Sequence, residues 1–207
     1  MSFDVDIALQ RGETRIACRF ATGPGITALT GPSGAGKTSV LHAIAGLLRP
    51  VQGRIAVGGS VLFDASAGID MPPQHRACGF VFQDLRLFPH RRVRENLLYG
   101  WRLAPPQRRW LSLEEALAFL DIGPLLRRLP RTLSGGEAQR IAIGRALLSG
   151  PRFVLMDEPL TSLDGARRDG IITVIERIRD ELGLPILLVT HDDREVDRLA
   201  DHVIPLV

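Results

Sequence analysis

One segment, Gly31-Pro32-Ser33-Gly34-Ala35-Gly36-Lys37-Thr38, constrains the fold of this chain more than any other. It fits G-x-x-x-x-G-K-[ST], the pattern of a phosphate-binding loop. In that pattern, glycines let backbone N–H groups curl around phosphates, the lysine neutralises the phosphate charge and the threonine hydroxyl can hold Mg²⁺. Lys37 is the only lysine in the chain, whose other long cationic side chains are all arginines. The segment therefore predicts a site for the phosphates of a nucleotide.

The residues on either side predict the two elements that such a loop needs. Residues 25–30 form a short apolar, β-branched run, which is typical of a buried strand. Residues 39–48 predict a helix. Its expected apolar face consists of Val40, Leu41, Ile44, Leu47 and Leu48. A strand, a glycine-rich loop and a helix direct the positive helix end at phosphate. The alternative, a glycine-rich turn that binds nothing, is disfavoured by the lysine and both flanks.

Composition argues against an exported or membrane-spanning chain. About 45% of the residues are apolar, yet no apolar run approaches the ~18 residues of a membrane span. The N-terminus carries early acids and lacks the positive-then-apolar pattern of a signal peptide. Cys18 and Cys78 are too few and too far apart for a disulfide framework. We therefore expect a cytosolic protein with reduced, packed thiols.

Arginines gather between residues 86 and 131, where acids are few. They are Arg86, Arg91, Arg92, Arg94, Arg102, Arg108, Arg109, Arg127, Arg128 and Arg131. Three interpretations stay open: a solvated helical face, a docking surface for an acidic partner, or a surface near anionic lipid headgroups. A nucleic-acid partner is disfavoured because no aromatic stacking pattern lies among the arginines.

Periodicity predicts one domain, residues 1–207, with three zones. The first, to about residue 65, combines β-like segments with the phosphate loop, and residues 54–63 predict a hairpin turning at Gly58-Gly59. The second, about 84–132, predicts a helical insertion, in which a capping box at Ser112 opens a helix over 113–120. The third alternates helices with strands, which predicts a mostly parallel, helix-covered sheet. Its expected helices are 137–148 and 167–182, and its expected strands are 153–156, 186–189 and 202–206.

Two acids, Asp157 and Glu158, follow the apolar strand expected at 153–156. At the carboxyl end of a parallel strand beside a phosphate loop, Asp157 can hold Mg²⁺ through water, and Glu158 can polarise an attacking water. Acids at a strand end can also be simple helix caps. The phosphate loop earlier in the chain favours the catalytic interpretation.

A second anion-binding pattern is Leu133-Ser134-Gly135-Gly136-Glu137, a serine and two glycines at the start of a helix. The simpler interpretation is an ordinary N-cap at Ser134. One nucleotide needs only one phosphate loop, so a second phosphate-binding element indicates that it serves a nucleotide held by another subunit.

This segment resembles the LSGGQ signature of the ATP-binding subunits of ABC transporters, and further family motifs follow in register over essentially the whole chain. Gln83 matches the glutamine that senses Mg²⁺ and the transport partner. Ser162-Leu163-Asp164 matches the loop that crosses the dimer interface, and His191 matches the switch histidine that contacts the γ-phosphate. A lone histidine after a strand would otherwise be a packed or capping residue.

The resemblance implies an α/β P-loop core of ABC-ATPase type, an N-terminal antiparallel β portion and an inserted helical subdomain at about 84–132. It implies catalytic roles for Lys37, Glu158 and His191, and Mg²⁺ on Thr38, Gln83 and Asp157. The ATP-binding residues would be Gly31, Pro32, Ser33, Gly34, Ala35, Gly36, Lys37, Thr38 and Ser39.

The resemblance also implies partners. In the ATP-bound state two copies would form a homodimer, each phosphate loop facing Ser134-Gly135-Gly136 of the other copy. The dimer would power integral membrane permease subunits from the cytoplasmic face of the inner membrane, and would serve a substrate-binding protein indirectly. No nucleic acid is expected.

Within the family, the chain is most similar to the molybdate-importer ATPases, which makes molybdate or a related oxyanion the expected cargo. The matching segments are 61–64, 68–73, 82–90, 93–100 and 125–130. Related sugar and polyamine importers share Leu87-Phe88-Pro89-His90 but less of the rest, and they remain an alternative. A soluble ABC ATPase acting on nucleic acid or ribosomes is disfavoured because tandem cassettes and long coiled-coil insertions are lacking. Intact Lys37, Glu158 and His191 argue against a non-catalytic binding module.

Three departures from the family pattern stand out. Glu137 replaces a glutamine that is frequent in the signature, although glutamate is common among importers. No aromatic residue lies about 20–25 residues before the phosphate loop, where many relatives stack the adenine, so adenine selectivity is unexplained. The sequence stops at Val207, so we expect no C-terminal oxyanion-binding regulatory domain in this chain, as in a shortened piece or a natural short form.

Overall fold

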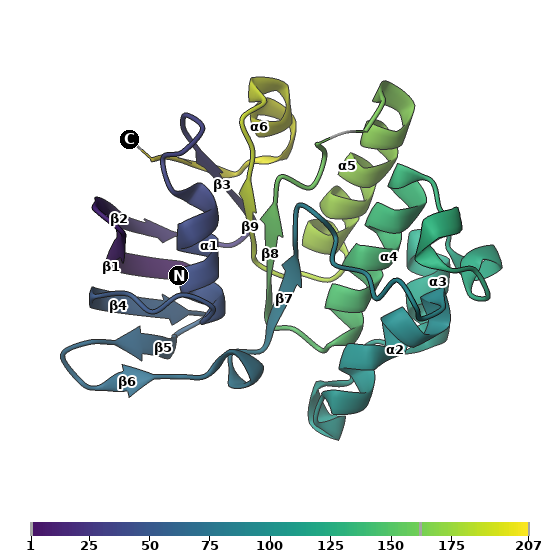
Figure 1. The fold of residues 1–207 in the computed structure, drawn as a ribbon, viewed down its shortest axis with the longest axis horizontal. Helices are drawn as coiled ribbons and strands as arrows, with labels where there is room; N and C mark the ends of the chain where they lie inside the picture. Colours follow the sequence, from purple (N-terminus) through teal and green to yellow (C-terminus); the bar gives the residue numbers. More distant parts are fainter. Residues whose placement is uncertain (1, 162, 207) are drawn as a thin grey trace.

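A computed structural model describes residues 2–161 and 163–206, in which two five-stranded sheets pack with helices around them (Figure 1). The antiparallel sheet has the order β2-β1-β4-β5-β6 and the parallel sheet β10-β3-β9-β8-β7. The antiparallel strands are β1 (Phe3–Arg11), β2 (Thr14–Thr22), β4 (Gln52–Val57), β5 (Ser60–Asp64) and β6 (Ile69–Asp70). The parallel strands are β3 (Ile26–Thr30), β7 (Cys78–Val81), β8 (Phe153–Asp157), β9 (Ile186–Val189) and β10 (His202–Pro205).

The helices lie on both faces of the parallel sheet. In Figure 1, α1 lies between the two sheets, and α2 to α5 lie beyond the parallel sheet on its other side. The α-helices are α1 (Lys37–Ala45), α2 (Val93–Leu103), α3 (Leu113–Leu120), α4 (Gly135–Leu148), α5 (Gly165–Asp180) and α6 (Asp193–Leu199). Short 3-10 turns are η1 (Pro73–His75), η2 (Pro106–Arg108), η3 (Gly123–Leu125) and η4 (Pro130–Thr132). No described helix is long and apolar enough to cross a membrane.

The central parallel strands β3, β8 and β9 are mostly apolar because both of their faces are buried. In β8, Val154 and Met156 pack with α4 and α5, whereas Phe153 and Leu155 pack with α1 and the antiparallel sheet. The α/β core and the antiparallel β portion predicted from the sequence are therefore present. The two cysteines are free thiols, and burial raises the pKa of Cys18 to about 11.

Short-range signals located several elements correctly. The hairpin turns at Gly58-Gly59, with Val57 opposite Ser60. The expected capping box opens α3, where Ser112 Oγ accepts a hydrogen bond from the Glu115 N–H at 3.2 Å. The helices and strands expected in the last zone are all present, with ends shifted by at most two residues.

Two sequence expectations were wrong. The helix expected over 39–48 begins at Lys37 and ends at Ala45, because Gly46 takes a left-handed conformation (φ 81°) and caps it. Leu47, expected on its buried face, is 51% exposed. The zone expected to be helical from residue 84 is irregular up to α2, which begins at Val93.

Gly53 in β4 gives a stability prediction. Its φ is +101°, and a Cβ there would lie 1.9 Å from the Asp6 carbonyl oxygen of the paired strand β1. We expect Gly53→Ala to lower the free energy of unfolding by about 3 kcal/mol or more, because backbone strain and overlap add. Gly58→Ala is the matched control: φ is also positive (+55°), but the space is open. It should cost about 1 kcal/mol. Urea unfolding would measure both, and equal losses would contradict this explanation.

Candidate nucleotide site

The phosphate loop connects β3 to α1 and requires glycine at its ends. Gly31 has φ +139°, and a Cβ there would lie 2.2 Å from the Leu206 carbonyl oxygen. Gly36, the N-cap of α1, has φ +96° and would bring a Cβ to 2.4 Å from Ile16 Cδ1. No side chain caps the first turn of α1. The loop can therefore offer backbone N–H groups and the helix dipole to an anion.

Lys37 is the first residue of α1 and is 7% exposed. Its Nζ donates hydrogen bonds to the carbonyl oxygens of Gly31 (2.7 Å) and Pro32 (2.9 Å). These bonds hold the ammonium inside the curve of the loop, where a phosphate would meet it. A buried lysine with this geometry fits the predicted role of phosphate neutralisation.

A cavity of about 480 Å³ in front of the loop brings distant segments together. Ser33, Gly34 and residues 36–39 line it from the loop and α1. Gln83, Glu158 and His191 line it from the segments that follow β7, β8 and β9. The carboxyl ends of parallel strands meet at one edge of a sheet, which is where open α/β folds bind ligands.

Thr38 and Asp157 offer oxygen atoms suited to a metal ion. Thr38 Oγ1 donates a hydrogen bond to Asp157 Oδ1 at 3.0 Å, and Asp157 is 4% exposed. Burial raises the pKa of Asp157, while the hydrogen bond from Thr38 opposes the rise. The described residues include no cluster of three or more acidic, histidine or cysteine ligands. This donor set fits Mg²⁺, which is commonly held by one or two protein oxygens together with substrate phosphates and water.

Glu158 is the centre of a small polar network. Gln83 Nε2 and Thr161 Oγ1 donate hydrogen bonds to Glu158 Oε2 at 3.2 and 3.0 Å. His191 Nδ1 lies 3.5 Å from Glu158 Oε1. Glu158 has a φ of +46°, a strained value for a residue with a side chain. Strain of this kind is typical of functional sites, and here it points the carboxylate into the cavity beside His191.

The signature segment lies away from this cavity. Ser134, Gly136 and Glu137 line a separate cavity of about 460 Å³ near Arg140 and Arg167. Ser134 also caps α4, since its N–H donates to Glu137 Oε2 (2.7 Å) and its Oγ accepts from the Glu137 N–H (3.3 Å). Within one chain, the structure therefore does not bring the phosphate loop and the signature together.

The expected dimer loop follows β8. Ser162 lies outside the described residues. Leu163 packs against the core, and its Cδ2 would lie 3.4 Å from a Cβ on Gly135 of the signature segment. Asp164 is the N-cap of α5 and accepts a hydrogen bond from the Arg167 N–H at 3.1 Å. The loop thus touches the start of the signature helix.

One arginine in the site and one that supports a segment beside it escaped sequence reasoning. Arg11, at the end of β1, lines the nucleotide cavity. Arg145 of α4 donates hydrogen bonds to the carbonyl oxygens of Leu85 (2.7 Å) and Arg86 (2.5 Å), both in the left-handed region. Arg145 thereby supports the bend that follows Gln83. Only the pairing of remote segments reveals these contacts, and no local motif marks them.

Comparison with known proteins places the chain in a family. Residues 19–161 match the family described as ABC transporter. The chain belongs to the ABC transporter family. Its fold matches that of another member, the dimeric structure of the ABC transporter cassette MJ0796, with a TM-score of 0.79 at 26% identity. That match covers 100% of this chain and 94% of the other.

Two relatives at higher identity are molybdenum import ATP-binding proteins. The molybdenum import ATP-binding protein ModC of Paramagnetospirillum magneticum is 52% identical over 96% of this chain and 54% of its own length. ModC of Brucella suis biovar 1 is 54% identical over 98% of this chain and 56% of its own length. The chain thus spans about half the length of these relatives.

Proposed function

We propose that this chain is the ATP-hydrolysing subunit of an ABC importer whose cargo is molybdate or a related oxyanion. One observation carries the ATPase: a single cavity holds the phosphate loop with Lys37, the catalytic candidates Glu158 and His191, and Gln83. The ModC relatives, at 52% and 54% identity, support the choice of cargo.

The chemistry relies on positioning and charge stabilisation. Lys37 and the N–H groups of residues 33–39 hold the phosphates, and Glu158 takes a proton from the attacking water. His191, which lines the same cavity beside Glu158, contacts the γ-phosphate. A Mg²⁺ ion on the oxygens of Thr38, Asp157 and Gln83 would neutralise charge on the β- and γ-phosphates.

A second copy of the chain completes the ATP-binding site. The signature residues Ser134 and Gly136 lie in a different cavity from Lys37, so only another subunit can present them to the nucleotide. In a two-fold homodimer, the phosphate loop of each copy faces the signature segment of the other copy, and the two ATP sites are equivalent. The loop at 162–164, beside the signature helix, would lie in that interface.

The same homodimer couples ATP hydrolysis to transport. The segment after Gln83 and the arginine-rich surface between residues 86 and 131 would contact integral membrane permease subunits. The chain would then act as one nucleotide-binding domain, with the helical subdomain at about 84–132, on the cytoplasmic face of the inner membrane. A substrate-binding protein would meet only the permease.

Arg11 is proposed to hold the nucleobase, because the described residues that line the cavity include no Phe, Tyr or Trp. A guanidinium is planar and stacks on aromatic faces.

We expect Arg11→Ala to weaken ATP binding by about threefold to tenfold, because a cation–π contact of about 1 kcal/mol is lost. Binding of inorganic tripolyphosphate, which has no base, should change less. Arg15→Ala, an exposed arginine outside this cavity, is the control. Equal losses for ATP and tripolyphosphate in calorimetry would exclude stacking.

The importer assignment is tested by purifying tagged Glu158→Gln protein from native membranes with ATP and Mg²⁺ present. We expect a permease to copurify, and a molybdate- or tungstate-binding protein with it. A permease accompanied by a sugar- or polyamine-binding protein would keep the importer and change its cargo. Copurification of ribosomal or DNA-bound proteins alone would reject the transport function.

A further inference from the structure

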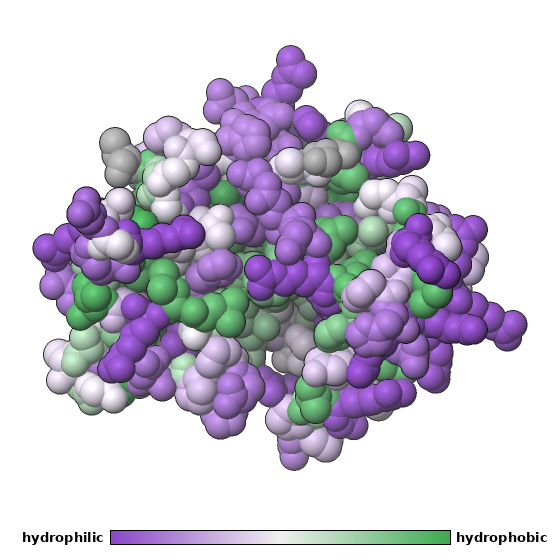
Figure 2. All heavy atoms as spheres, in the orientation of Figure 1, coloured by the Kyte–Doolittle hydropathy of each residue, from purple (hydrophilic) through white to green (hydrophobic). Residues whose placement is uncertain are grey.

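A second cavity, of about 280 Å³, lies at the opposite ends of β7 and β8 from the nucleotide cavity. Ala77 and Phe153, at the starts of these strands, line it, whereas Gln83 and Glu158, just beyond their ends, line the nucleotide cavity. A strand of five residues spans roughly 16 Å, so the two cavities are separate. Figure 2 shows this face hollowed between the antiparallel sheet and the helices.

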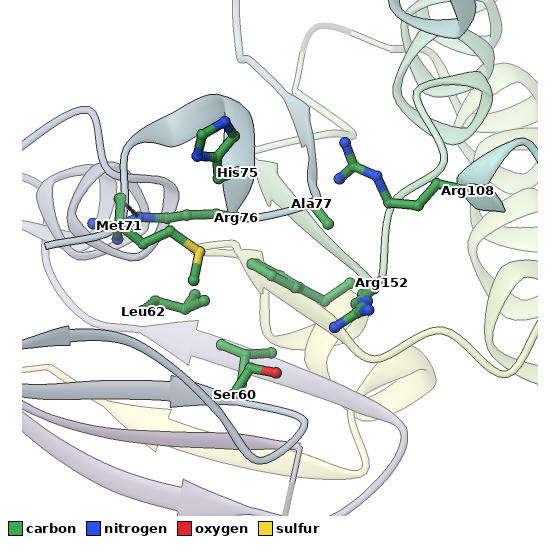
Figure 3. Close-up of a pocket in the computed structure, with 10 residues that line it drawn as sticks. Ser60, Leu62, Met71, His75, Arg76, Ala77, Arg108 and Arg152 are labelled. Atoms are coloured by element: carbon green, nitrogen blue, oxygen red, sulfur yellow. Dashed lines mark hydrogen bonds between the residues drawn. The ribbon is translucent and has the colours of Figure 1, made fainter. Parts of the chain in front are cut away.

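The inner wall of this cavity is apolar. Leu62 of β5 and Phe153 of β8 are 2% and 1% exposed, and both line the cavity. The Met71 thioether lies beside Leu62 (Figure 3). The volume is just below the range of about 300–1,000 Å³ that small-molecule cavities occupy. The cavity can therefore bury a compact apolar or aromatic body.

The rim is basic and carries no opposing acid. His75, Arg108 and Arg152 line it, and none of their side chains makes a hydrogen bond or ion pair within the described chain. No Asp or Glu is among the described residues that line the cavity. Figure 3 shows Arg108 and Arg152 on one side of the cavity and His75 across from them.

The neighbouring Arg76 is different, because its hydrogen bonds are already satisfied. Its guanidinium donates to the carbonyl oxygens of Met71, Ala43 and Ile44 and pairs with Asp70 at 3.2 Å. In Figure 3 its side chain runs away from the cavity. Arg76 therefore builds the wall, and the guanidinium groups of Arg108 and Arg152, together with the His75 ring, are left for a ligand.

Backbone contacts hold together the segments that carry the two rim arginines. Gly150 (φ +67°) packs so closely that a Cβ would lie 2.1 Å from the Arg108 carbonyl oxygen. The Arg152 N–H donates to the Ala77 carbonyl oxygen at 2.8 Å, and Trp110 Nε1 donates to the Pro151 carbonyl oxygen at 3.3 Å. Two guanidinium groups held beside a hollow with apolar walls focus a positive potential into it.

We propose that this cavity binds a small organic anion: an apolar or aromatic body on the Leu62, Met71 and Phe153 wall, with one phosphate or carboxylate group between Arg108, Arg152 and His75. Arginine suits this role because its planar fork of donors matches both anionic groups. The inference does not depend on the proposed transport function, since no residue of the nucleotide cavity takes part.

Phenyl phosphate is a suitable probe, and its binding to the whole chain is measured by calorimetric titration. Inorganic phosphate and phenol, the two fragments of this probe, are titrated separately for comparison. We expect phenyl phosphate to bind at least about tenfold more tightly than either fragment, because the wall and the rim each contribute. Arg108→Ala and Arg152→Ala should each weaken it about tenfold or more, the usual effect of losing a charge-assisted hydrogen bond. Arg127→Ala, an exposed arginine outside the cavity, should leave affinity unchanged. So should Lys37→Ala, which removes the lysine of the phosphate loop.

Three results would overturn the proposal. The first is the absence of saturable binding at millimolar phenyl phosphate, and the second is equal binding of inorganic phosphate. The third is a loss in Lys37→Ala or Arg127→Ala as large as in Arg152→Ala, since the probe would then occupy the phosphate loop or bind surface charge generally. Thermal unfolding of each variant shows whether it folds, and two independent rim substitutions keep the test decisive if one does not.

Discussion

Glu158→Gln is expected to slow ATP turnover by about 10²–10⁴ while ATP binding is retained, which is the usual size of a lost general base. Glutamine keeps the shape of the side chain and can still accept the hydrogen bonds that Gln83 and Thr161 donate to Glu158 Oε2. It cannot take a proton from water. The loss should therefore fall on kcat, and the dissociation constant of ATP should change little.

Phosphate release under saturating ATP and Mg²⁺ measures this effect, and equilibrium binding of a fluorescent ATP analogue measures affinity. Glu114→Gln makes the same chemical change at an exposed position in the first turn of α3 and should turn over normally. Unchanged turnover in Glu158→Gln would remove Glu158 from the reaction. A parallel loss in both variants would point to damage unrelated to catalysis.

Lys37→Ala is expected to weaken ATP binding by about 10–100-fold or more, because a charge-assisted contact with phosphate is lost from a water-poor loop. Lys37 is 7% exposed, and its ammonium is held by the carbonyl oxygens of Gly31 and Pro32. Lys37→Arg should also bind poorly, since a wider guanidinium does not replace a compact ammonium inside this curve.

Calorimetry with ATP measures the Lys37 effect, and Arg127→Ala is the control for a general change in positive charge. Thermal unfolding without nucleotide separates a binding loss from a folding loss. If Lys37→Ala bound ATP with the affinity of the unchanged chain, the phosphate loop would not be the phosphate site.

The parts of the fold that sequence reasoning located are those governed by neighbouring residues. The hairpin at Gly58-Gly59 and the capping box at Ser112 depend on a few adjacent side chains and backbone angles. The end of α1 was missed although Gly46 marks it, because the apolar spacing of Leu47 and Leu48 continued the helical pattern. Strand β1 has an alternating signal, with Phe3, Val5, Ile7 and Leu9 buried, but its bounds depend on pairing with β2 and β4.

The residues of the candidate site fall into the same two groups, those in local sequence patterns and those placed by long-range contacts. The phosphate loop and the Asp157-Glu158 pair are local patterns, and the parallel sheet brings them to one edge. Arg11 and Arg145 act across long sequence separations, so no local pattern reveals them. The catalytic, metal-binding and dimer roles of the site residues stay predictions, because they concern ligands and a second copy rather than the folded chain itself.

The central claim, that ATP joins two copies of this chain through the phosphate loop and the signature, is tested most directly by sedimentation of Glu158→Gln protein with and without ATP and Mg²⁺. We predict a monomer of 22.7 kDa without nucleotide and a particle of twice that mass with ATP. Adding Lys37→Ala to the same chain should abolish the shift. A monomer that persists at saturating, demonstrably bound ATP would contradict the account.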